Sequence, residues 1–454
     1  MRITLFLLLA FLGGCAGPAV ETAKVEPVTP PDTWRTSLSP TAAADIDWWQ
    51  GFGDPVLAAL VKQALTNNLD IAIAGARIRD AKAQEMAARA ALLPTLDAAG
   101  AGARSRSVSP FGTPSVQTAA QPQLQAAWEI DLFGRLSDQQ SAARSAWLAS
   151  QAARDGVRLS IASTMANGYV TLLALDARLA VARQTVDARA QALALIRRRA
   201  DAGYSPRLEL AQAQAEYQTA LQGITPLEQA ISRQENALKF LAGDLPGPIA
   251  RGGTLAALKE PAVPDGLPSE LLRRRPDVAQ AELQLAGADH ALAAARKRFL
   301  PQVRLTGAGG AAFSTLLADP ITLWSVGGSI LAPLFEGGRL RASAESAGAQ
   351  RDSAAFAYRR TALNSFREVE DAMAGIVSAD DQVRVISAQR DALAETLHLA
   401  TNRYRAGYSP YLEQLDAQRG LLAAELNLVQ ARADSFTARI ALYQAMGGSW
   451  QRSP

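Results

Sequence analysis

An internal repeat constrains the fold of this 454-residue chain more than any other feature of its sequence. The segment Ala-Gly-Tyr-Ser-Pro occurs at residues 202–206 and again, letter for letter, at residues 406–410. Four other segments of the first half have counterparts in the second half, in the same order: 68–71 with 275–278, 92–94 with 299–301, 131–136 with 333–340, and 237–243 with 441–447. Ordered agreement over this length is hard to obtain by chance, so we expect two halves built from the same elements.

Each half predicts helices, two strands, a very long helix and a return helix. In the first half these are helices over 55–67 and 70–92, strands over 95–109 and 116–133, and a helical hairpin over 134–242. In the second half they are a helix over 277–299, strands over 302–314 and 321–334, and a hairpin over 338–446. The chain therefore divides into repeat 1 (55–250), a linker (251–266), repeat 2 (267–447) and a C-terminal tail (448–454).

The two long helices are unusual. Residues 134–200 and 338–406 contain no proline, and a helix of sixty-odd residues is about 100 Å long, which is more than a globular domain needs. The return helix and the helix before the strands add up to a similar length, so each half predicts one long layer of paired helices. Together these lengths predict a cylinder of helices with strands at one end.

The repeated Ala-Gly-Tyr-Ser-Pro segment supplies the residue types of a helix–helix turn. Glycine suits the C′ position because it adopts positive φ, serine suits the N-cap, and proline suits the first helical position. The expected C′ residues are Gly203 and Gly407, the N-caps Ser205 and Ser409, and the first helical residues Pro206 and Pro410.

The strand over 116–133 alternates between apolar and polar side chains. Leu124, Trp128 and Ile130 share one face, whereas Gln123, Gln125 and Glu129 share the other. This pattern is typical of a membrane barrel strand, although a soluble sandwich with one wet face would also show it. No run of eighteen apolar residues occurs after the N-terminus, so strands are the elements that could cross a membrane. Four strands cannot close a barrel, but three copies of the chain would supply twelve.

The N-terminus predicts export and lipidation. Residues 1–14 form a short positive region followed by an apolar stretch too short to span a bilayer, as in a signal peptide. Leu12-Gly13-Gly14-Cys15 resembles a bacterial lipobox, in which the cysteine becomes the acylated N-terminus, although a plain signal peptide is the alternative. Ala16 favours sorting to the outer membrane, and the proline-containing residues 15–54 predict an extended tether.

Composition excludes several other classes. Cys15 is the single cysteine and the chain has two histidines, so no disulfide framework, metal site or cofactor is expected. The net charge of +3 and the scattered basic residues argue against binding to nucleic acid. Glu129 and Asp131 could imitate a catalytic acid/base pair, but on one strand face they more simply line water. For His290 a solvated helix face is the simpler interpretation.

The ordered motifs resemble those of the TolC-type outer-membrane efflux factors, in particular the lipidated, OprM-like branch that serves RND-type pumps. The carriers of the resemblance are Trp48-Trp49, Phe52-Gly53-Asp54-Pro55, residues 271–278, 299–301, 333–335 and 337–339, and both repeated turns. The resemblance implies a homotrimer with a twelve-stranded transmembrane β-barrel, four strands from each protomer, continued by a twelve-helix periplasmic α-barrel. It also implies that the channel exports small molecules passively, docked to a periplasmic adaptor and an inner-membrane pump. Residues 15–54 would then include an equatorial segment, and the linker 251–266 would also lie at the equator of the channel.

The resemblance further implies two functional sites at the hairpin tips. The expected residues of a periplasmic gate are Glu413, Asp416, Tyr404 and Arg403, and those of the adaptor-docking rim are Gly203, Tyr204, Ser205, Gly407, Tyr408 and Ser409. At the positions equivalent to the two gate acids, the first repeat has Glu209 and Gln212. Ser409 stands where the family often has a basic residue.

Two other functions stay open at this point. An outer-membrane component of a type I secretion or metal-efflux system would share the scaffold, although the lack of Met or His clusters argues against copper or silver export. A structural periplasmic coiled-coil lipoprotein would explain Cys15 and the heptad pattern of the return helices, but it would not explain the alternating strand.

Overall fold

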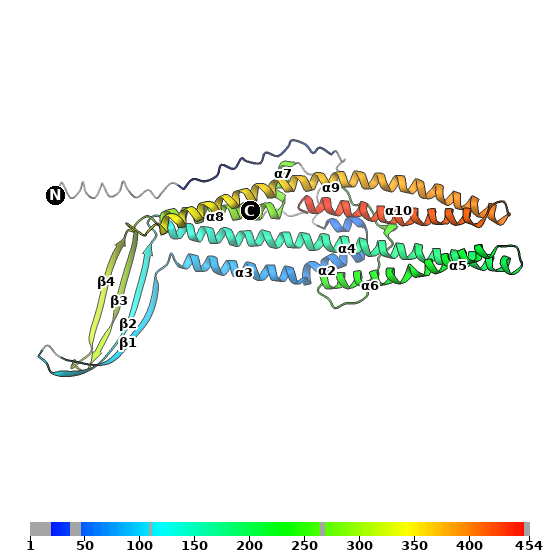
Figure 1. Cartoon of the computed structure of the whole chain (residues 1–454). Coiled ribbons are helices and arrows are strands. Elements are labelled where there is room, and N and C mark those ends of the chain that lie inside the picture. The colour runs from blue at the N-terminus through cyan, green and yellow to red at the C-terminus, as the bar shows by residue number, and fades with distance from the viewer. Residues whose placement is uncertain (1–19, 37–46, 109–110, 264–267, 449–454) are drawn as a thin grey trace. The chain divides into compact units, whose positions relative to one another are not determined.

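A computed structural model describes residues 20–36, 47–108, 111–263 and 268–448 (Figure 1). The predicted signal peptide (1–14) and Cys15 lie outside these residues. The chain forms two compact units, and repeat 1 and repeat 2 contribute to both. The described part of the first unit comprises residues 20–27, 76–108, 111–151 and 280–360, with the whole β-sheet; the second unit comprises the other described residues. The division into two repeats thus follows the sequence and not the compact units, and its boundaries stay a prediction.

Helices make up most of the described chain, as expected. Those of the first half are η1 (Trp48–Phe52), α2 (Pro55–Asn67), α3 (Leu69–Ala90), α4 (Arg135–Asp201), α5 (Arg207–Gln222) and α6 (Ile224–Leu241). Those of the second half are η2 (Leu255–Ala257), α7 (Pro268–Arg274), α8 (Pro276–Lys297), α9 (Arg339–Arg405) and α10 (Tyr411–Ala445). The long helices α4 and α9 each contain 67 residues, so their expected length is confirmed. None of the described helices has an apolar stretch long enough to cross a membrane.

The return helix of the first half is interrupted, which the sequence pattern did not predict. It ends at Gln222 and resumes at Ile224. Pro226 has no N–H to donate to the carbonyl of Gln222, and its ring crowds that carbonyl. Gly223 keeps helical dihedral angles and donates instead to the carbonyl of Ala220 at 3.2 Å, so the helix tightens for one residue and then continues. The equivalent helix α10 is unbroken over 35 residues.

The four strands form one antiparallel sheet in the order β1-β2-β3-β4: Thr95–Val108, Pro114–Ile130, Gln302–Ser314 and Ile321–Leu331. The central pair, β2 and β3, joins the first half of the chain to the second, and the outer strands β1 and β4 are the edges. Each half therefore supplies one hairpin, as the repeat predicts. A sheet with two open edges does not close on itself, so further strands must come from other copies.

Two strands are shorter at their C-terminal ends than the sequence predicted. β2 ends at Ile130 instead of 133, because Asp131 turns to cap helix α4. Its carboxylate accepts hydrogen bonds from the backbone N–H groups of Leu136 at 2.9 Å and Ser137 at 2.8 Å. Desolvation raises the pKa of Asp131, but these bonds and one from the Ser137 hydroxyl outweigh it and lower the pKa overall. β4 ends at Leu331 instead of 334, and Pro333 has no N–H with which to extend the ladder.

The turns between the long helices and the return helices differ from expectation by one residue. Pro206 and Pro410 are extended at ψ 150° and 159°, so they occupy the N-cap positions that we expected for Ser205 and Ser409. The prolines fit there because a helix begins without needing the N-cap N–H. The expected positive φ of the glycines is confirmed, at 78° for Gly203 and 80° for Gly407.

The core of the second unit forms around the Trp-Trp…Phe-Gly-Asp-Pro motif of the sequence. Trp48 and Phe52 are buried, and Trp48 stacks on Tyr443 with ring centroids 5.1 Å apart. Asp54 caps α2 and accepts a hydrogen bond from the hydroxyl of Tyr169 at 3.0 Å. Desolvation and the neighbouring Asp54 raise the pKa of Tyr169 to about 12. The motif therefore fastens the N-terminal segment to α4 and α10.

Candidate functional site

The two faces of the sheet differ in chemistry. Residues paired directly across antiparallel strands project to the same side, so the register assigns every strand residue to a face. One face carries mostly apolar side chains: Leu96, Val108, Val116, Leu124, Trp128, Leu305, Phe313, Trp324, Val326 and Ile330, with Arg104, Arg106, Thr118 and Thr322 as polar members. The other carries mostly polar ones: Asp97, Ser105, Ser107, Gln117, Gln121, Gln123, Gln125, Glu129, Arg304, Thr306, Ser325 and Ser329, with Ile321, Leu323 and Leu331 as apolar members. This division matches a wall between lipid and water.

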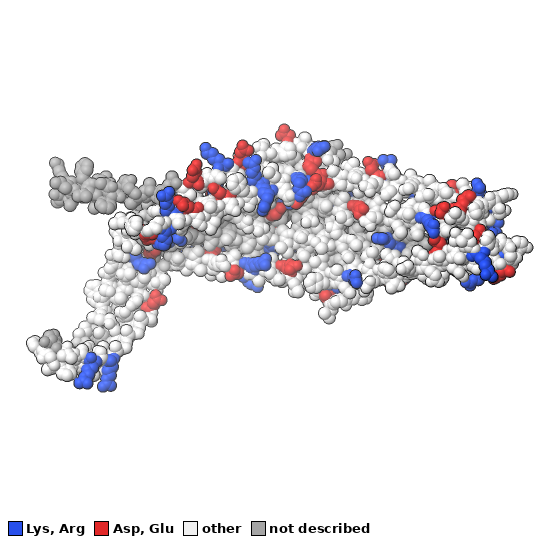
Figure 2. All heavy atoms as spheres, in the orientation of Figure 1, with Lys and Arg blue, Asp and Glu red and all other residues white. Residues whose placement is uncertain are grey.

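The expected alternation of β2 is therefore shared by the sheet. Glu129 lies opposite Arg304 on the neighbouring strand β3. Its carboxylate forms an ion pair of 2.5 Å with Arg135. Glu129 and Asp131 do not act together, because Asp131 leaves the strand to cap α4. Charged side chains are sparse over the sheet in Figure 2 and frequent over the helices.

The hairpin tips of the second unit expose the residues that we expected to form the docking rim. Tyr204 and Tyr408 are 85% and 82% exposed. A Cβ atom added to Gly203 or Gly407 would meet no atom within 4 Å, so positive φ is the constraint that selects glycine there. Each tip thus presents a glycine turn with one exposed tyrosine to solvent.

Behind the turns, a buried cluster joins the tips of the two hairpins. It contains Ile196 and Ala213 from the first hairpin and Tyr404, Tyr411 and Leu415 from the second. The hydroxyl of Tyr404 donates to Glu209 at 3.4 Å, and Arg199 lies over the Tyr404 ring at 5.1 Å. Burial and the charge of Glu209 raise the pKa of Tyr404. Tyr404 is therefore a buried link between the two hairpins in this chain.

The two expected gate acids lie at the start of α10 and are accessible. Glu413, in the first turn, forms an ion pair with Arg403 at 3.3 Å, and both side chains are about half exposed. Asp416 is 66% exposed and lies 3.9 Å from Arg419. Exposed ion pairs of this kind contribute roughly 0–1 kcal/mol to stability, so both carboxylates can still bind other cations.

Further along the hairpins, Glu216 of α5 bridges two arginines. It contacts Arg189 of α4 at 3.5 Å and also Arg419 of α10. Arg189 is buried and donates in addition to Gln418. These residues connect the two hairpins next to a cavity of about 770 Å³ between α4, α5, α6 and α10.

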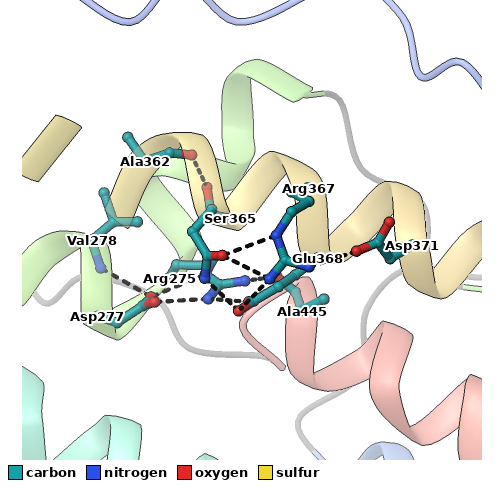
Figure 3. Close-up of polar contacts among 10 residues, drawn as sticks. Arg275, Asp277, Val278, Ala362, Ser365, Arg367, Glu368, Asp371 and Ala445 are labelled. Atoms are coloured by element: carbon teal, nitrogen blue, oxygen red, sulfur yellow. Dashed lines mark hydrogen bonds and ion pairs between the residues drawn. The ribbon is translucent and has the colours of Figure 1, made fainter. Parts of the chain in front are cut away.

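A buried arginine joins the beginning of repeat 2 to its end (Figure 3). Arg275, between α7 and α8, donates to the carbonyl of Ala445 in α10 at 2.9 Å. It forms ion pairs of 2.7 Å with Asp277 and with Glu368 of α9. Although desolvation lowers it, these two carboxylates raise the pKa of Arg275 overall. The three helices therefore meet at one side chain.

Repeat 1 has the same joint with a neutral residue. Asn68, the counterpart of Arg275, donates from its side-chain amide to the carbonyl of Leu241 in α6 at 2.9 Å. The glycine two residues after each carbonyl, Gly243 or Gly447, lies so close to the joint that an added Cβ would collide with backbone. We name these contacts the repeat joints.

The linker is fastened to both halves by ion pairs of exchanged sign. Arg251 binds Asp176 of α4 at 2.7 Å and Glu235 of α6 at 2.5 Å. In the second half, Asp380 and Arg439 are the counterparts of Asp176 and Glu235. Arg439 binds Asp380 at 2.9 Å and the linker residue Glu260 at 2.7 Å. The linker thus supplies the cation to one half and the anion to the other.

Known proteins with this architecture identify the family. The family model described as "Outer membrane efflux protein" matches residues 60–244 and 267–448. The chain belongs to the outer membrane efflux protein family. The antibiotic efflux pump outer membrane protein ArpC of Pseudomonas putida is 31% identical over 466 residues, covering 99% of this chain and 95% of ArpC. The toluene efflux pump outer membrane protein TtgC of Pseudomonas putida is 32% identical over 467 residues, with coverages of 99% and 95%.

A solved structure agrees over the same extent. The crystal structure of the open state of the Neisseria gonorrhoeae MtrE outer membrane channel matches this efflux protein with a TM-score of 0.84 and 29% identity, covering 96% of this chain and 99% of MtrE. The resemblance drawn from the sequence is confirmed, and the interpretation as a coiled-coil lipoprotein is set aside. These relatives are named as channels or pump components and not as enzymes. No group of His, Cys, Asp and Glu that could hold a metal occurs among the described residues of this efflux protein.

Sequence reasoning located the tips of this efflux protein but missed the residues behind them. Arg189, Glu216 and Arg419 come from three helices, and no local pattern brings them together. The sequence identified Glu209 as the first-repeat counterpart of Glu413 but not its contact with Tyr404. The gate and docking roles of the expected residues stay predictions, as does lipidation of Cys15, which lies outside the described residues.

Proposed function

We propose that this efflux protein is the passive outer-membrane duct of a tripartite pump that exports small toxic molecules. In this proposal three copies close their sheets into a twelve-stranded barrel, and their helices form a periplasmic tunnel. The observation that carries it is the open-edged sheet with one apolar and one polar face, in a chain whose long helices are all paired in hairpins. Relatives named for antibiotic and toluene efflux support small, apolar cargo.

The partners in this proposal are a periplasmic adaptor and an inner-membrane pump of the RND type. A passive duct has no energy source, so the pump must supply it. Acylation of Cys15 would add a lipid anchor to the barrel, and labelled palmitate should enter the wild-type protein but not Cys15→Ser. Deletion of the gene should sensitise cells to apolar toxic compounds, and the purified trimer should form conducting pores in a planar bilayer. A monomer that forms no pores would contradict the proposed function.

We propose that Glu413 and Asp416 form rings of negative charge at the periplasmic end of the trimer, with Arg403 and Tyr404 as supporting residues. Like charges around one axis bind multivalent cations. Replacing both acids by alanine should raise the closed-state conductance and weaken block by multivalent cations by roughly tenfold. Asp416 should contribute more than Glu413, because Glu413 lies closer to its arginine (3.3 Å) than Asp416 does (3.9 Å) and is the less exposed of the two acids. Asp381→Ala, which removes an exposed, paired acid on α9, is the control. Unchanged block in the double variant would remove both acids from the gate.

We propose that both glycine turns, with Tyr204, Ser205, Tyr408 and Ser409, form the rim that docks the adaptor. Gly407→Asn should preserve efflux, because asparagine tolerates positive φ and stays small. Gly407→Trp should cost the left-handed strain of about 1–2 kcal/mol but no collision, since nothing lies within 4 Å of the new Cβ, so most of the trimer should persist while efflux falls severalfold by obstruction of the partner. Trimer level and drug efflux are measured separately. Parallel loss of both would assign the glycines a role in folding alone.

A further inference from the structure

The apolar face of the sheet carries two arginines at one end. Arg104 and Arg106 of β1 pair with Thr118 and Val116 of β2, on the face that also carries Leu124. Both side chains are exposed, and Figure 2 shows basic groups projecting at that end of the sheet. Within the described residues, neither guanidinium has an ion pair or a hydrogen bond. Two unneutralised cations therefore lie on a mostly apolar face.

Their level along the strand indicates what they face. Trp128 lies beside Ala127, the partner of Thr95, at the end of the sheet from which α4 departs. Arg104 is about ten residues further along, or roughly 33 Å of strand, which becomes about 25 Å across the membrane at a tilt near 40°. The apolar band of outer-membrane barrels is about 25 Å tall. If Trp128 marks the inner interface, Arg104 and Arg106 lie at the headgroups of the outer leaflet.

We propose that Arg104 and Arg106 bind the phosphate groups of lipids in the outer leaflet. This inference rests on the proposed function, because it requires the apolar face to contact a membrane. Residues two apart on a strand project side by side about 7 Å apart, so the pair can hold one doubly phosphorylated headgroup. Each guanidinium can donate two parallel hydrogen bonds to a phosphate. Val108 and Val116, on the same face, offer an apolar surface to acyl chains.

The energetics favour this position. Arginine on the lipid face of a barrel is strongly unfavourable at the bilayer centre, but costs little near an interface. Serines at 105 and 107, on the polar face, have the same level without the charge. A role in attracting solutes inside the pore would place the arginines on that polar face instead. The face and the level together therefore select a lipid phosphate.

The test uses the purified full-length trimer and lipid A with two phosphates, with bound lipid counted by native mass spectrometry. Arg104→Gln combined with Arg106→Gln should weaken lipid A binding by about tenfold or more. A second variant moves the charges to the polar face without changing the net charge: Arg104→Ser, Ser105→Arg, Arg106→Ser and Ser107→Arg. It should lose binding to the same extent. Trimer level and heat modifiability on SDS gels identify variants that fail to fold.

The outcomes separate the possible sources of phosphate. Inorganic phosphate at millimolar concentration should fail to displace lipid A, and dephosphorylated lipid A should bind the wild type as weakly as the double variant. Displacement by inorganic phosphate would overturn the lipid site in favour of a simple anion site. Unchanged lipid A binding in a folded double variant would overturn the inference while leaving the channel in place. Failure of the wild type to form pores would instead contradict the proposed function.

Discussion

Replacing Gly447 by alanine should prevent most molecules of the protein from forming a stable trimer. Gly447 has φ +84°, and a Cβ there would lie 2.3 Å from the carbonyl oxygen of Arg274 and 2.9 Å from its carbon. Backbone atoms cannot rotate away as a side chain does, so α10 would have to leave the repeat joint. Left-handed strain and overpacking together should cost roughly 3 kcal/mol or more.

Gly407→Ala is the matched control for this experiment. Its φ is +80°, nearly the same as that of Gly447, but nothing lies within 4 Å of the added Cβ. It should therefore show the left-handed strain alone, about 1–2 kcal/mol. The temperature at which SDS-resistant trimers dissociate measures both variants. Equal losses at the two positions would show that the close approach at the repeat joint contributes nothing.

Arg275→Met should be almost as damaging, for an electrostatic reason. The arginine is buried, and its loss removes the side-chain donor to the carbonyl of Ala445 and the cation that pairs with both Asp277 and Glu368. Removing one partner of a buried ion pair costs about 3–5 kcal/mol, and the partial exposure of the two acids moves the expected value to the lower end.

Arg367→Met tests whether charge alone explains the effect. Arg367 immediately precedes Glu368 on α9 (Figure 3), but its side chain is 61% exposed and pairs with Asp371 along its own helix. Its loss should change stability by less than about 0.5 kcal/mol. Thermal dissociation of the trimer again provides the measurement. A comparable loss of trimer stability in both variants would show that the contacts of Arg275 in the repeat joint contribute no more than an exposed ion pair.

The elements that could be predicted from the sequence are those determined by local patterns. Proline-free stretches indicated α4 and α9, and alternation in residues 123–130 indicated a two-faced sheet. The ends of the strands and the break in the return helix were not predicted, because they depend on single residues: Asp131 accepts hydrogen bonds from the start of α4, and Pro226 removes one hydrogen bond from its helix. The repeat joints could not be predicted, since Arg275 meets a carbonyl 170 residues away. The same holds for the tips, where Glu216 gains its role from arginines on two other helices.

The exchanged signs of the linker ion pairs bear on how such a chain can have evolved. If the two halves descend from one duplicated segment, each has since become dependent on its own end of the linker. A protein assembled from two copies of the first half would place Glu235 and its duplicate against the linker, with no arginine in place of Arg439 to meet Glu260. Three chains of two halves and six separate halves would supply the same number of strands. Only a chain of two different halves offers an ion-pair partner to each end of the linker. The exchanged charges thus match each half to its own end of the linker.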